Sequence, residues 1–163
     1  NRIGNFKVEI LKAYTPVFFD NYRKLLCIFS AFQLIKILTA ESQKNLKIYS
    51  LIKNFYTFLE KENWIKNYIF WELEFFKVIG YDLELKNLVK KELINNEVKY
   101  FVKSTKENKI VPNFLIDNNQ DFLNEEILID GLRLVGDYLE KSILKPNNIN
   151  YPLNRLRFLN TFK

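Results

Sequence analysis

The side chains that most often do chemistry in proteins are scarce in this sequence. It contains no histidine and a single cysteine, Cys27. Neither a Ser–His nor a Cys–His nucleophile pair can therefore be built, and neither can a His/Cys zinc site. The glycines, at positions 4, 80, 131 and 136, do not form a glycine-rich phosphate-binding loop. The sequence thus argues against nucleophilic, zinc-dependent and nucleotide-dependent catalysis.

Carboxylates are the remaining class for acid–base or metal chemistry. Glu72 and Glu74 lie in an aromatic segment with helical spacing, so they project about 200° apart around the helix. On opposite sides of the helix the two carboxylates cannot act together as an acid–base pair. We expect one of the two to be buried in an ion pair with an arginine such as Arg133. A carboxylate-dependent enzyme is the alternative, and a cluster of carboxylates in a deep pocket would favour it.

The composition and charge bound the possible partners. Hydrophobic residues make up 48% of the 163 residues, and only 4 Gly and 4 Pro are present, which favours a helical core. No apolar run is long enough for a membrane span and no signal peptide is present, so we expect a soluble intracellular protein. Residues 1–60 hold nine Lys/Arg against four Asp/Glu, whereas residues 61–163 hold sixteen against fifteen. The basic N-terminal part suits phosphate or an acidic peptide, although lysines that only maintain solubility are the alternative.

The opening segment has the periodicity of a strand. Phe6, Val8 and Ile10 alternate with Lys7 and Glu9. Because a lone strand cannot satisfy its backbone hydrogen bonds, its ladder partners should belong to a missing region. We therefore interpret residues 1–15 as the end of a truncated β-domain.

Three helices are predicted next. The first runs from Pro16 to about Leu38, and its apolar stripe consists of Phe18, Tyr22, Leu25, Phe29 and Phe32. These aromatic residues could form a base-stacking platform, but at helical spacing we interpret them as core. The second helix covers Leu46–Leu59. The third begins at Trp64 and ends at Gly80, with Asn63 as its expected cap, and its broad apolar surface places it in the middle of a bundle.

The rest of the chain is predicted as an appendage and two more helices. Leu83 and Leu85 alternate with acidic residues, which indicates an extended exit from the central helix. Val98–Val102 and residues 110–111 flank a polar tip, which predicts a small hairpin. Asn124 is expected to cap a helix whose core stripe is Leu128, Leu132, Val135, Leu139 and Ile143 and which Pro146 ends. A short final helix should start near Pro152.

Several segments, in order, resemble the RecO family of recombination mediators. The strongest match is Glu72-Leu73, the helix end at Gly80-Tyr81 and the Leu83-x-Leu85 that follows. Residues 2–9 are similar to the Leu-Gly-x-x-x-Val-Glu run that closes the family's N-terminal OB-fold. Further similar segments are Leu38–Glu41, Ile48-Tyr49, Leu132–Glu140 and Pro152–Arg157. The resemblance implies that residues 1–15 end an OB-fold domain and that residues 16–163 form the family's C-terminal helical domain.

The chain departs from the family pattern in one region. Many members carry cysteine pairs after the Leu-x-Leu and hold a zinc ion with them, but residues 86–111 contain no cysteine. We therefore expect neither zinc nor another cofactor. Packing of Leu88, Val89, Tyr100 and Phe101 should hold this region together instead.

The resemblance implies a non-enzymatic mediator of DNA repair. Such proteins bind single- and double-stranded DNA, mainly through the OB-fold, and promote strand annealing. They work with RecR and single-strand-binding protein to load RecA, in the bacterial cytoplasm and without a membrane partner. The helical domain of the family receives the acidic, apolar C-terminal tail of single-strand-binding protein, which needs a hydrophobic groove edged by cations.

Five cations are candidates for contact with DNA or with this tail. They are Arg2, Lys7 and Lys12, on or beside the predicted strand, and Arg23 and Lys24, on the first helix. Solvated surface cations without a binding role are the alternative. Two further arginines, at positions 155 and 157, could touch DNA, but we expect them to pack the final helix.

We therefore predict a mainly α-helical bundle with a small β-hairpin appendage and a residual N-terminal OB-fold strand. Its predicted role is that of a recombination mediator. A helical protein–protein interaction adaptor that is not connected with DNA is the alternative.

Overall fold

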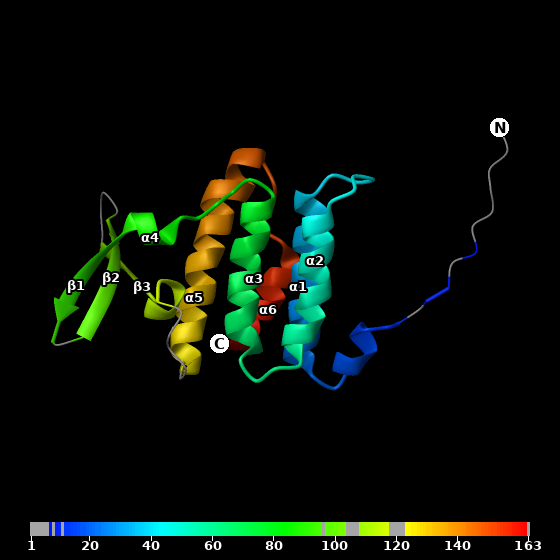
Figure 1. Ribbon diagram of the computed structural model, residues 1–163, viewed down its shortest axis with the longest axis horizontal. Coiled ribbons are helices and arrows are strands. Elements are labelled where there is room, and N and C mark those ends of the chain that lie inside the picture. Colours follow the sequence, from blue (N-terminus) through cyan, green and yellow to red (C-terminus); the bar gives the residue numbers. More distant parts are fainter. Residues whose placement is uncertain are drawn as a thin grey trace.

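Six α-helices and a three-stranded antiparallel sheet form the described part of the computed structural model (Figure 1). The structure describes residues 7, 9–10, 12–95, 97–103, 108–117 and 123–162. The α-helices are α1 (Tyr22–Leu38), α2 (Leu46–Leu59), α3 (Trp64–Val78), α4 (Leu85–Leu88), α5 (Glu125–Tyr138) and α6 (Leu153–Leu159). The strands are β1 (Val89–Ile94), β2 (Glu97–Lys103) and β3 (Asn108–Val111). The predicted class, mainly α with a small β appendage, is confirmed.

Helix α3 is the centre of the bundle. Figure 1 shows it between α2 and α5, while α6 packs along α1. Its buried side chains are Trp64, Tyr68, Ile69, Trp71, Glu72, Phe75 and Phe76. Gly80, with φ of 97°, turns the chain at the end of α3, where the amide of Tyr81 donates to the carbonyl of Phe76. The central helix and its glycine stop were predicted correctly.

Helix α2 matches its predicted range and buried face, and α5 begins directly after its predicted cap. Phe55 and Leu59 of α2 are buried. Leu132 and Val135, which belong to the predicted core stripe of α5, are buried as well. Asn124 caps α5 through its side chain, which accepts from the amide of Ile127 at 2.9 Å. Beyond Tyr138 the helix continues as a π segment, Leu139–Leu144, before a 3₁₀ turn, Lys145–Asn147.

The predicted cap of α3 is wrong. Asn63 precedes α3, but its side chain forms no capping hydrogen bond, and its Oδ1 accepts instead from the side-chain Nδ2 of Asn67 at 2.9 Å.

The first helix differs from its prediction in extent and in face. A 3₁₀ turn, Thr15–Phe18, precedes α1, which Asn21 caps by accepting from the amide of Lys24. The residues of α1 that are buried are Leu26, Cys27, Ile28, Ser30, Ala31 and Leu34. Tyr22, Phe29 and Phe32 of the predicted stripe are exposed. The smaller side chains face inward because they allow α6 and Tyr68 to approach closely.

The sheet lies at one end of the molecule, beyond α5 (Figure 1). Its order is β1–β2–β3, so the predicted hairpin is confirmed and β1 was missed. The sheet is held by Tyr100 and Val111, which are buried, and by a hydrogen bond from Tyr100 Oη to Asp117 at 2.6 Å. Leu88 is exposed, so its predicted packing role is wrong, and every residue of β1 after Val89 is exposed as well.

The predicted OB-fold strand falls largely outside the described residues. Phe6 and Val8, on which its periodicity depends, are not described. The described residues 7, 9–10 and 12–14 belong to no helix or strand. The strand and the division of the chain at residue 15 stay predictions. No helix in the described ranges has the length and hydrophobicity needed to cross a bilayer.

A buried ion pair joins the central helix to the last one. The guanidinium of Arg155 donates from Nε to Glu72 Oε1 at 2.9 Å and from Nη2 to Glu72 Oε2 at 2.7 Å, with both residues fully buried. Tyr68 Oη also donates to Glu72 Oε1, and Tyr151 Oη accepts from Arg155. Burial alone would lower the pKa of Arg155, but the charge of Glu72 outweighs it and raises that pKa, so the arginine stays charged.

The ion pair corrects the predicted partner of Glu72. Arg133 lies on the exposed face of α5 and pairs with Asp130 at 3.2 Å. A buried ion pair at one of Glu72 and Glu74 was expected, whereas the identity of the arginine was not.

Removing one member of the buried pair should destabilise the protein strongly. Arg155→Ala leaves Glu72 charged in the core, and we expect the free energy of unfolding to fall by about 3–5 kcal/mol. Urea unfolding followed by tryptophan fluorescence measures this loss. Arg157→Ala, on the exposed side of the same helix, should change stability by less than about 0.5 kcal/mol. A loss for Arg155→Ala below about 1 kcal/mol would show that the pair does not hold the core together.

Cys27 should be unreactive in the folded protein. It is completely buried, and burial, followed by the charge of Glu72, raises the pKa of its thiol. The thiolate fraction at pH 8 is therefore lower than for a free cysteine, and a reagent must wait for unfolding. Modification by a chromogenic disulfide should be slow in buffer and fast in urea. Equal rates in the two conditions would contradict this packing.

Candidate functional site

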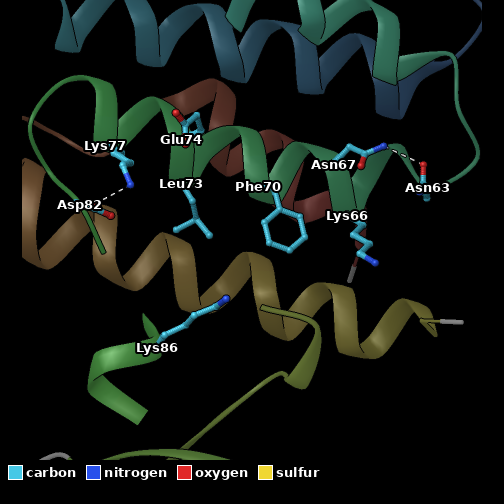
Figure 2. A pocket seen from close by; sticks show the side chains of 9 residues that line it. All are labelled: Asn63, Lys66, Asn67, Phe70, Leu73, Glu74, Lys77, Asp82 and Lys86. Carbon is cyan, nitrogen blue, oxygen red and sulfur yellow. Dashed lines mark hydrogen bonds and ion pairs between the residues drawn. The ribbon is translucent and has the colours of Figure 1, made fainter. Parts of the chain in front are cut away.

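A groove runs along the face of α3 that the core does not use. Figure 2 shows its lining residues, of which Lys66, Phe70, Leu73 and Lys77 project from α3 toward α5 and α4. They are Asn63, Lys66, Asn67, Phe70, Leu73, Glu74, Lys77, Asp82 and Lys86, around a volume of about 790 Å³. The α3 members recur at steps of three and four, so helical geometry gathers them on one face. Lys86 reaches the same space from α4 (Figure 2).

The floor of the groove is apolar. Phe70 and Leu73 are half-buried there, and the ring of Phe70 meets the ring of Phe114 edge to face at 6.0 Å. Gly131 of α5 makes room for this arrangement, because a Cβ at that position would lie 2.6 Å from Phe114 Cζ. A side chain that enters the groove would meet a supported aromatic surface.

The rim of the groove carries both signs of charge, with cations in excess. Lys66, Lys77 and Lys86 line the groove together with Glu74 and Asp82. Lys77 Nζ lies 3.1 Å from Asp82 Oδ2, and this hydrogen bond raises the pKa of Lys77. The positive charge of Lys77 is therefore constant across the neutral pH range. An apolar floor beneath a cationic rim suits an acidic peptide with a large apolar side chain.

The residues that line the groove do not include a nucleophile paired with a base. The titratable side chains among them are lysines and two exposed carboxylates. Within the described ranges, no three His, Cys, Asp or Glu side chains are placed to hold a metal ion. The expected absence of zinc stays a prediction.

The described cations among those predicted from the sequence do not line this groove. Arg2 lies outside the described residues. Lys7 is exposed, and Lys12 Nζ lies 4.7 Å from the ring centre of Tyr14. Their role in binding stays a prediction.

Arg23 and Lys24 lie at the start of α1. Arg23 pairs with Glu125 at 2.6 Å and donates to the carbonyl of Thr161 at 2.9 Å, so it ties α1 to α5 and to the C-terminal turn. It also lines a smaller pocket of about 470 Å³ together with Tyr22, Arg157, Asn160 and Thr161. Lys24 Nζ lies 5.9 Å from the ring centre of Phe18. Arg23 therefore has structural partners, and Lys24 packs over an aromatic ring.

The cations of the groove were missed from the sequence. Lys66, Phe70, Leu73 and Lys77 do share helical spacing, which was the available signal. The broad apolar surface of α3 made every face of this helix resemble core. Lys86 belongs to a short helix that follows an extended segment, and its direction depends on tertiary packing.

Comparison with known proteins gives one consistent family. A family model described as "Recombination protein O C terminal" matches residues 20–148. The chain is 31% identical over 136 residues to a DNA repair protein RecO of Rickettsia canadensis. The aligned region covers 76% of this chain and 56% of that relative. It is 32% identical to the protein of the same name from Rickettsia africae, over 76% of this chain and 57% of that relative. The chain thus spans little more than half the length of these curated relatives, and no solved structure gives a significant match.

The floor of the groove should depend on Gly131. Gly131→Val forces the buried ring of Phe114 to move, and we expect the free energy of unfolding to fall by about 1–3 kcal/mol. Urea unfolding measures the change, with Asp130→Ala on the exposed side of α5 as the control. Equal stability of Gly131→Val and the unmodified protein would mean that α3 and α5 are not closely packed there.

Proposed function

Because the chain belongs to the RecO family, we propose that it is the helical part of a recombination mediator in DNA repair. The proposed role is non-enzymatic and consists of binding DNA and partner proteins. Strand annealing, work with RecR and the loading of RecA belong to this proposal, since the chain spans only part of its relatives. The absence of a histidine from the sequence and the lack of a nucleophile–base pair in the groove support a binding role.

The groove of Figure 2 carries the proposal. We assign it to the acidic, apolar C-terminal tail of single-strand-binding protein, the partner that the family resemblance implies. The terminal aromatic ring of such a tail would lie on Phe70 and Leu73, and its carboxylates would meet Lys77 and Lys86 at the rim. Glu74 repels an acidic chain from one side of the groove and so favours one direction of entry.

Titration with a labelled peptide tests this assignment. The peptide is acidic, ends in phenylalanine and carries fluorescein, and binding is followed by fluorescence anisotropy at low salt. Lys77→Gln with Lys86→Gln should weaken binding roughly tenfold, since two rim charges contribute about 1–2 kcal/mol together. The loss should shrink at high salt because the contacts are screened.

A matched variant locates the effect. Arg23→Gln with Lys24→Gln removes the same two charges outside the groove and should leave the peptide affinity within about twofold. Leu73→Ser should weaken binding at every salt concentration, because it changes the apolar floor. If the Arg23 and Lys24 pair proves sensitive and the groove pair does not, the tail binds at the start of α1. If the unmodified chain does not bind the peptide at low salt, the assignment of the tail fails.

A further inference from the structure

The outer face of α1 carries aromatic side chains that stay exposed, although Phe32 also meets the buried ring of Phe55 edge to face. Tyr22 is 66% exposed, Phe29 is 45% exposed and Phe32 is 37% exposed. Helical geometry places the three within an arc of about 80°, with Lys36 on the same arc. Large exposed rings in a row along one helix are uncommon on a surface without a partner.

The rings continue onto α2. The ring centre of Phe32 lies 6.1 Å from that of Tyr56, which stacks in turn on Tyr14 at 4.9 Å. The aromatic surface therefore extends over both helices of the α1–α2 hairpin and reaches the segment before the first 3₁₀ turn.

The charge of the two helices is of one sign. Neither α1 nor α2 contains an aspartate or glutamate, whereas together they contain Arg23, Lys24, Lys36, Lys47 and Lys53. The only acid between residues 21 and 59 is Glu41, in the connecting loop. The groove along α3, by contrast, mixes lysines with Glu74 and Asp82. Two helices without acidic side chains of their own favour the approach of a polyanion, to which Lys24, Lys36, Lys47 and Lys53 contribute, since Arg23 is paired with Glu125.

We propose that the outer face of the α1–α2 hairpin binds single-stranded DNA, with bases stacked on Tyr22, Phe29 and Phe32 and phosphates beside Lys36 and Lys53. Exposed aromatic faces between cations are the means by which proteins hold single strands without reading their sequence. Duplex DNA keeps its bases stacked and cannot use the rings. An apolar protein partner could bind a face that carries acidic side chains, whereas a polyanion would be repelled by them. The absence of acids from both helices therefore favours nucleic acid over a protein as the ligand. This inference rests on the proposed role in DNA repair and assigns one contact with DNA to this surface.

Stacking is tested with the whole 163-residue chain and fluorescein-labelled oligonucleotides. The probes are a 20-nucleotide thymidine strand and an abasic strand of the same length and charge, and anisotropy gives Kd at several salt concentrations. Tyr22→Ala with Phe29→Ala should weaken binding of the thymidine strand by at least about tenfold and leave the abasic strand within about twofold. Leu93→Ala with Ile110→Ala, which removes two exposed apolar side chains from the sheet, is the matched control.

The phosphate contacts have their own test. Lys36→Gln with Lys53→Gln should weaken both strands equally and reduce the salt dependence, with a slope smaller by about 1.4 for two contacts. Lys90→Gln with Lys141→Gln removes the same charge from exposed sites elsewhere and should leave the slope unchanged. Thermal unfolding shows that each variant is folded.

The outcomes separate this inference from the proposed function. If the ring variant binds the thymidine strand as tightly as the unmodified chain, or loses both strands equally, the stacking surface is refuted. If the chain binds the acidic peptide but no oligonucleotide at low salt, the inference fails and the tail assignment stands. If Tyr22→Ala with Phe29→Ala retains DNA binding but sediments as a monomer where the unmodified chain sediments as a dimer, the face joins two copies of the chain. The proposal is then wrong.

Discussion

The ion pair between Glu72 and Arg155 is the constraint around which the bundle is arranged. Two charges without solvent are tolerated only when every lone pair and N–H group near them has a partner. Tyr68 and Tyr151 supply such partners, and Ser30 binds Tyr68 in turn at 2.9 Å. Because these residues come from α1, α3, α6 and the short segment before α6, the helices have one mutual arrangement that satisfies the network. The pair is therefore a reason for a single packing as much as a source of stability.

Helix α3 has one face in the buried core and another face on the groove. One face holds Glu72 and the aromatic core, while the opposite face forms the floor of the groove with Phe70 and Leu73. A side chain on the groove face can therefore change without disturbing the buried network. The α1–α2 hairpin provides a second surface, with the contrasting property that its helices carry no acids. The two surfaces suit ligands of different chemistry on one rigid body.

Much of this fold follows from periodicity, and the failures have physical causes. The range of α3 was predictable because its apolar spacing and the glycine after it agree with each other, and the range of α2 was predictable from apolar spacing alone. The face of α1 was not, because Tyr22, Phe29 and Phe32 form as regular a stripe as the smaller residues that are buried. The strand β1 lacks alternation since it is exposed on both faces. The partner of Glu72 is 83 positions away in the sequence, and the groove depends on where α4 and α5 lie against α3.

The exposed strand β1 has a consequence for the behaviour of the protein in a crowded solution. As an outer strand of the sheet it presents one unpaired row of backbone groups, to which a strand of another molecule could add. Its sequence there is Lys90-Lys91-Glu92, so any approaching strand must desolvate or oppose three adjacent charges. These charges discourage intermolecular strand addition, and the small sheet can stay open at its edge without starting an aggregate.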